Sequence, residues 1–108
     1  MTTITMRITL ACPGRKATGW VRLLEDGDLE FELYDREYQD SDWATMYRVA
    51  ANQLPFLFTA MTQSTGDNVD TPGELLAAIE RHYPNWDEAF SWLSTSGVKF
   101  TRTDDPWA

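Results

Sequence analysis

Residues that could perform covalent chemistry are few in this chain. His82 is the only histidine and Cys12 the only cysteine. A Cys–His nucleophilic pair would require a loop cysteine to meet a histidine near a helix end, with no third group to orient the two. A histidine in the last turn of a helix has a simpler role as a cation that complements the helix dipole. No serine lies in a Gly-x-Ser-x-Gly motif, and we therefore expect a protein that is not an enzyme.

Metal and phosphate chemistry are also poorly supported. A structural zinc site needs clustered Cys and His residues, which the sequence lacks. Asp26, Asp28, Glu30 and Glu32 alternate as on a pleated strand, whereas a calcium loop of the EF-hand type needs fixed ligand positions between two helices. The glycines are isolated, so no phosphate-binding loop is predicted. Many carboxylate pairs exist, but none is marked for acid–base catalysis. The sequence predicts no cofactor and no metal.

Charge is the most informative feature. The first 24 residues contain four basic and no acidic residues, and the segment 25–42 contains nine carboxylates and one base, Arg36. The formal net charge is −8, which argues against nucleic acid and against anionic membrane surfaces as partners. Local fields of this strength steer association with oppositely charged molecules. We therefore expect a basic protein partner.

Aromatic residues accompany the acidic segment. Tyr34, Tyr38 and Trp43 are of the types enriched at interface centres. An acidic run is also compatible with a solvated face that only keeps a protein soluble, and this alternative stays open. If the segment is an interface, we expect the following partner-binding residues: Asp28, Glu30, Glu32, Tyr34, Asp35, Glu37, Asp40 and Asp42.

Strand patterns fill the N-terminal half. Apolar residues alternate with polar ones over residues 3–11, 18–24, 29–35 and 43–49, which predicts four strands. Asp26-Gly27 lies between the second and third of them and is a strong hairpin signal. Because alternate residues of a strand point to opposite faces, the third strand should have one buried face and one acidic face.

Helix signals fill the C-terminal half. Asn52 is expected to cap a first helix, the capping box Thr71-Pro72-Gly73-Glu74 to start a second, and Asn85 to start a third. Gly97 suits the left-handed residue after a helix. A last short strand is expected over residues 98–103.

Strands followed by helices, without βαβ alternation, indicate an α+β fold in a single domain spanning residues 1–108. We expect an antiparallel four- to five-stranded meander sheet with about three helices packed on one face. The other face would carry Glu30, Glu32 and Tyr34. No apolar run approaches the length of a membrane span. The single cysteine excludes an internal disulfide and fits a cytoplasmic location.

The order of these features resembles that of small acidic bacterial immunity-type proteins from toxin–immunity systems. The resemblance extends from Gly19 onward and is carried by Asp26-Gly27-Asp28-Leu29, Tyr47-Arg48-Val49, Leu54-Pro55, Leu75-Leu76, Trp92-Leu93 and Gly97-Val98. It implies a compact cytoplasmic inhibitor that covers the active site of a basic nuclease-type toxin, and it implies no catalytic residue.

Three other functions stay open. One is a phage-type anti-defence protein, similar to anti-CRISPR proteins, that mimics nucleic acid and occupies a basic channel. Another is a small ligand-binding domain or enzyme with a pocket between helices and sheet. The third is a scaffold with no charge-driven partner.

Overall fold

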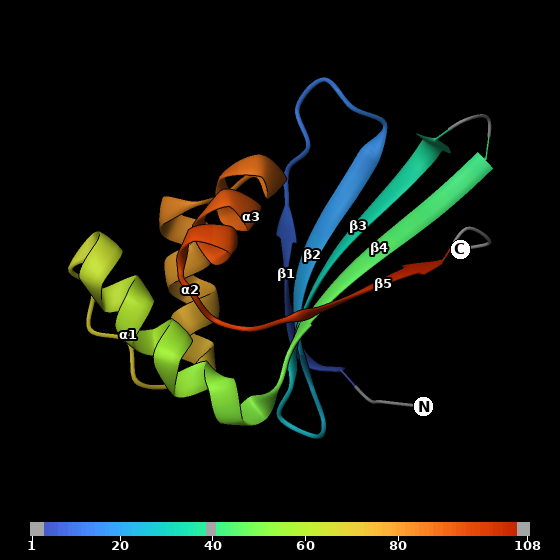
Figure 1. The fold of residues 1–108 in the computed structure, drawn as a ribbon. Helices are drawn as coiled ribbons and strands as arrows, with labels where there is room; N and C mark the ends of the chain where they lie inside the picture. Colours follow the sequence, from blue (N-terminus) through green and yellow to red (C-terminus); the bar gives the residue numbers. More distant parts are fainter. Residues whose placement is uncertain (1–3, 39–40, 106–108) are drawn as a thin grey trace.

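The chain forms one five-stranded antiparallel sheet with its helices on one side of it (Figure 1). The computed structural model describes residues 4–38 and 41–105. The elements are β1 (Ile4–Leu10), β2 (Ala17–Leu24), β3 (Leu29–Tyr38), β4 (Ser41–Val49), the 3₁₀-helix η1 (Ala51–Gln53), α1 (Leu54–Thr65), α2 (Pro72–His82), α3 (Trp86–Thr95) and β5 (Thr101–Asp105). The strands follow one another across the sheet in chain order. The predicted α+β meander is confirmed.

The hairpin between β2 and β3 forms where Asp26-Gly27 predicted it. Gly27 has a φ of +91°, a conformation that a side chain would strain, and its amide donates to the carbonyl of Leu24. The amide of Leu24 donates in turn to the carbonyl of Asp28. These bonds fix the register that places β2 beside β3.

The predicted starts of α2 and α3 are confirmed, whereas the expected cap of the first helix by Asn52 is wrong, because Asn52 lies within η1 and the residue before α1 is Gln53, whose side chain makes no capping bond. The side chain of Thr71 caps α2 by accepting from the amide of Glu74 at 3.2 Å, and that of Asn85 caps α3 by accepting from the amide of Glu88 at 2.9 Å. The helix α1 follows η1 and carries Pro55 in its first turn, where the missing N–H leaves no bond unmade.

Sheet and helices meet in one apolar core. Its largest fully buried side chains include Phe31 from the sheet and Leu57, Met61 and Ile79 from the helices. An aromatic group fixes α3 to the sheet: Tyr47, Trp86, Phe90 and Phe100 pack with ring centroids 4.5–6.3 Å apart.

The last strand begins three residues later than predicted. Val98 is buried, and the ring of Phe100 packs against Phe90 of α3 and edge-on against Tyr47 of β4, so the segment 98–100 lies between the helices and the sheet. The ladder between β4 and β5 therefore starts at the pair Arg48–Thr101. Contacts in the core determine where the strand begins, so the alternation of apolar and polar residues in the sequence does not predict this boundary.

Among the described residues, none of the helices has both the length and the apolar character required to cross a membrane.

Candidate protein-binding surface

One face of the sheet is turned away from the helices (Figure 1). On β3, Glu30, Glu32 and Tyr34 alternate with the buried residues Leu29 and Phe31, as the sequence predicted. The register places their cross-strand neighbours on the same side. We call this side the open face; its members on β2, β3 and β4 include Thr18, Trp20, Arg22, Glu30, Glu32, Tyr34, Ala44, Met46 and Arg48.

An arginine lies at the centre of the open face. Arg22 contacts Glu32 through Nη1 and lies 3.5 Å from Glu30, while its guanidinium carbon lies 4.8 Å from the ring centre of Trp20. The three charged side chains are only 14–18% exposed. Two of the predicted binding carboxylates therefore share one guanidinium from the neighbouring strand.

This network shifts the ionisation of Glu30. Burial raises the pKa of the Glu30 carboxyl, the negative charge of Glu32 raises it further, and Arg22 only partly opposes both effects. A raised carboxyl pKa also occurs at acid–base sites. Here, however, the carboxylates lie on a sheet surface and are engaged by Arg22, so the arrangement is that of a structural charge network.

Asp28 has a structural role at the hairpin turn. One of its carboxylate oxygens accepts from Nε of Arg48 at 2.8 Å, and the other accepts from the amide of Ala51 at 2.8 Å. Arg48 also reaches Asp26, with 2.6 Å between Nη2 and Oδ2. Burial works to raise the pKa of Asp28, but these hydrogen bonds outweigh it and hold the pKa below its ordinary value. Asp28 thus ties the hairpin to the chain that enters the helices.

The remaining predicted residues divide between two faces. The hydroxyl of Tyr34 donates to Asp42 at 2.6 Å on the open face, and this bond raises the pKa of the Tyr34 phenol. Asp35 alternates with Tyr34 and lies on the helix side, where Arg15 approaches it to 3.8 Å. The side chain of Glu37 and the whole of Asp40 lie outside the described residues. The predicted acidic set is therefore not a single patch, because the pleat separates its members.

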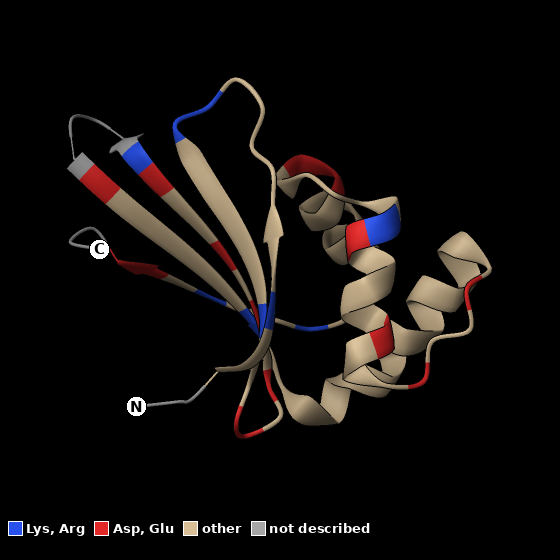
Figure 2. Cartoon of the chain, turned by 180° about the vertical axis from the view of Figure 1, so that it is seen from behind, with Lys and Arg blue, Asp and Glu red and all other residues tan. Residues whose placement is uncertain are grey.

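Strand pairing also removes the charge contrast seen along the sequence. The basic opening segment folds beside the acidic one, so that Arg22 lies opposite Glu30 in the β2–β3 ladder. Residues 67–88 contain six acids and one base, Arg81, so they carry more than half of the net negative charge. Figure 2 shows acidic residues on both the sheet and the helical layer.

The members of the open face on β2 and β4 were not predicted from the sequence: Thr18, Trp20, Arg22, Ala44, Met46 and Arg48. The signal was present on β2, where Thr18, Trp20 and Arg22 alternate with residues of the helix side. The prediction of the contact surface considered mainly carboxylates and therefore left these residues out.

Cys12 and His82 are not brought together. Cys12 makes only a weak contact with the carbonyl of Leu10, and burial raises the pKa of its thiol, which disfavours the reactive thiolate. His82 lies 2.8 Å through Nε2 from Asp67, which also accepts from Arg81 at 3.0 Å. These bonds tie the loop before α2 to the end of that helix. Within residues 4–38 and 41–105, no three His, Cys, Asp or Glu side chains form a group that could hold a metal ion.

Comparisons of the chain with protein-family models, with curated proteins and with solved structures find no match. The resemblance to immunity-type proteins stays a prediction, and the function has to be inferred from the residues of this chain.

Proposed function

We propose that this protein is a non-enzymatic inhibitor that binds a basic protein partner, as immunity proteins bind nuclease-type toxins, and that the open face is its contact surface. The observation that carries the proposal is a sheet face that the helices leave uncovered and that displays Trp20, Tyr34 and Met46, all half-buried, among paired charges. Aromatic residues, Met and Arg are the types enriched at the centres of protein interfaces.

Charge and contact would have separate roles. The net charge of −8 favours the approach of a basic partner and makes its association rate sensitive to salt. The charges of the open face are already paired with one another, as Arg22 is with Glu32. Rigid aromatic side chains between them supply the area that slows dissociation once the partner has docked.

The test is affinity capture from a lysate of the native host, with the recovered protein identified. A matched pair of variants locates the surface: Met46→Lys on the open face and Ala77→Lys on the exposed side of α2 each add one positive charge. We expect a basic protein that is released at about 1 M salt, where charges are screened within ~3 Å. Met46→Lys should weaken its binding about tenfold or more, the effect of losing more than ~1.4 kcal/mol.

Ala77→Lys should weaken the capture much less than Met46→Lys does, because a charge on α2 affects only the approach of the partner. The proposal is overturned if the captured protein is not basic, if the two variants have equal effects, or if nothing salt-sensitive is recovered.

A further inference from the structure

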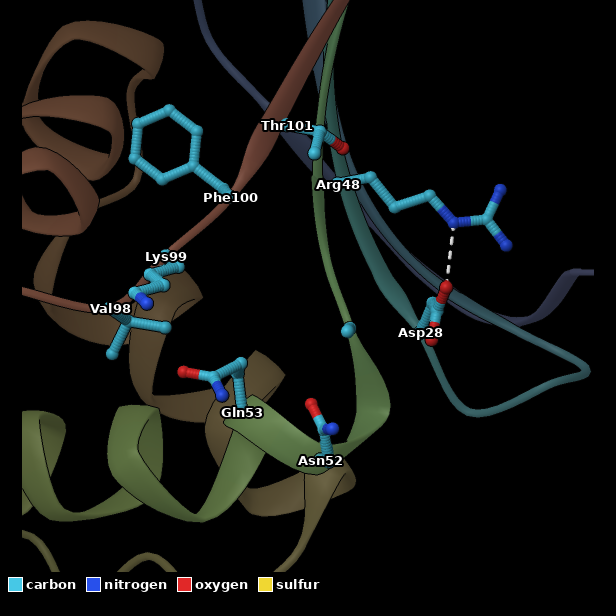
Figure 3. A pocket seen from close by; sticks show the side chains of 9 residues that line it. Asp28, Arg48, Asn52, Gln53, Val98, Lys99, Phe100 and Thr101 are labelled. Atoms are coloured by element: carbon cyan, nitrogen blue, oxygen red, sulfur yellow. Dashed lines mark hydrogen bonds and ion pairs between the residues drawn. The ribbon is translucent and has the colours of Figure 1, made fainter.

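The divergence of β5 from β4 opens a groove at the base of the sheet. Because the segment 98–100 leaves the sheet for the helices, an open hollow of about 730 Å³ separates it from the chain that links β4 to α1. Figure 3 shows this hollow, with Val98, Lys99 and Phe100 on one side and Asn52 and Gln53 on the other. Clefts of about 300–1,000 Å³ are the size that small ligands occupy.

Polar groups of the groove lack partners within the protein. Gln53 points from the start of the helical segment toward Val98 and Lys99, and Asn52 lies beside Gln53 (Figure 3). In the part of the chain that the structure describes, the side chains of Asn52, Gln53 and Lys99 take part in no hydrogen bond or ion pair. The backbone amides of Lys99 and Phe100 also donate to no described residue. Three side chains that can donate hydrogen bonds therefore line one space.

The groove also has an apolar extension. A second hollow of about 400 Å³ shares Gln53, Val98 and Lys99 with the first and runs along α1 past Phe56 and Ala60. Phe56 has an exposed fraction of 60%, which is high for a large apolar side chain, and Thr59, Gln63 and Ser96 also line this hollow. A cationic donor where the two hollows meet and a partly apolar channel leading from it define a site with two chemically different halves.

We infer that this groove binds a small amphipathic monocarboxylate. The carboxylate lies against Nζ of Lys99 with the amides of Asn52 and Gln53 beside it, and the apolar body runs past Val98 toward Phe56. Lys99 supplies a single point charge, whereas a phosphate group favours bidentate guanidinium donors. Asp28 and Arg48 also line the groove and are paired with each other, and Arg48 reaches Asp26 as well, so Lys99 is the cation that can receive one negative charge.

The inference goes beyond the proposed inhibitor function and does not depend on it. The probe is octanoate, with octanamide as its uncharged counterpart, titrated into ¹⁵N-labelled protein and followed by amide chemical shifts. We expect octanoate to shift the amides of Asn52, Gln53, Lys99 and Phe100, and octanamide to bind at least tenfold more weakly. The matched variants are Lys99→Gln and Lys16→Gln, because Lys16 is the only other lysine of the chain.

Lys99→Gln should weaken octanoate binding at least tenfold while the rest of the amide spectrum stays unchanged, and Lys16→Gln should bind as the unaltered protein does. Equal binding of octanoate and octanamide, shifts confined to other parts of the chain, or equal effects of the two variants would each overturn the site. The carboxylate could belong to a free small acid or to the C-terminus of a peptide. The competitor acetyl-Gly-Gly-Val, a peptide with a free C-terminal carboxylate, distinguishes the two. If it binds more tightly than octanoate, the assignment to a free small acid is wrong.

Discussion

Asp28, at the hairpin turn, and Glu30, on β3, lie two residues apart, yet their surroundings shift their pKa values in opposite directions. Burial acts on both carboxyls. For Asp28 the hydrogen bonds from Arg48 and from the amide of Ala51 overcome it, and the pKa falls. For Glu30 burial and the charge of Glu32 prevail over Arg22, and the pKa rises. Ionised Asp28 thus stabilises the folded protein, whereas ionisation of Glu30 lowers the free energy of unfolding.

Replacement of Asp28 by Asn should therefore lower the free energy of unfolding at neutral pH by about 1 kcal/mol. The folded-state pKa of Asp28 lies below its unfolded value, so its contribution is present above the unfolded pKa and disappears as the pH falls through the folded pKa. Urea unfolding of both proteins should show a clear difference at pH 7 that shrinks as the pH falls below about 4, the unfolded-state pKa.

Glu30→Gln is the control of opposite sign. The folded pKa of Glu30 lies above its unfolded value, so the unaltered protein loses stability as the pH rises through the interval between the two. Glu30→Gln removes that loss, and its stability relative to the unaltered protein should rise from acid to neutral pH. If the two variants changed in the same direction with pH, the assigned shifts would be wrong.

At the scale of elements, turns and helix caps that depend on residues close together in the chain could be predicted from the sequence. Thr71 and Asn85 cap their helices through bonds that span three residues, and Asp26-Gly27 forms its turn locally. The start of β5 depends on where Phe100 meets Tyr47, a contact between residues far apart in the chain. Such tertiary contacts override local pattern.

The candidate surface was predictable in part for the same reason. Alternation placed Glu30, Glu32 and Tyr34 on one face, because the side-chain period of a strand is a local property. The pairing of Glu32 with Arg22 required the register of β2 against β3, which no single strand contains. A run of carboxylates in the sequence therefore overstated the negative charge that the folded surface displays.

Packing of β2 against α3 leads to a prediction at this scale. A Cβ on Gly19 would lie 2.9 Å from the ring of Trp86, so Gly19→Ala should lower the free energy of unfolding by about 1–3 kcal/mol. A Cβ on Gly73 in α2 would meet only the end of Met6 at 3.8 Å. Gly73→Ala should therefore stabilise the protein by about 0.4–1 kcal/mol.

Chemical unfolding of the two variants beside the unaltered protein measures both effects. Equal changes in stability would show that Trp86 does not hold β2 in the position described. A loss confined to Gly19→Ala, with altered tryptophan fluorescence, is the expected result.

At the scale of the whole molecule, more than half of the net negative charge lies on the helical layer and not on the sheet that carries the open face. The segment 67–88, which contains α2 and the start of α3, carries six acids and one base. The charges on the open face are largely paired, as Arg22 is with Glu32 and Arg48 with Asp28. Since an electrostatic field extends about 8 Å at physiological salt, acids on the helical layer can influence the approach of a partner without touching it.

The two layers should therefore affect different steps of binding. With the partner recovered by capture, Glu80→Lys on α2 should slow association and weaken its dependence on salt while leaving dissociation unchanged, because Glu80 is exposed on the layer away from the contact. Trp20→Ala on the open face should speed dissociation about tenfold or more and leave the salt dependence of association intact.

Stopped-flow association and dissociation rates at several ionic strengths measure both effects. If Glu80→Lys speeds dissociation and Trp20→Ala does not, the partner contacts the helices, and the assignment of the open face as the contact surface fails.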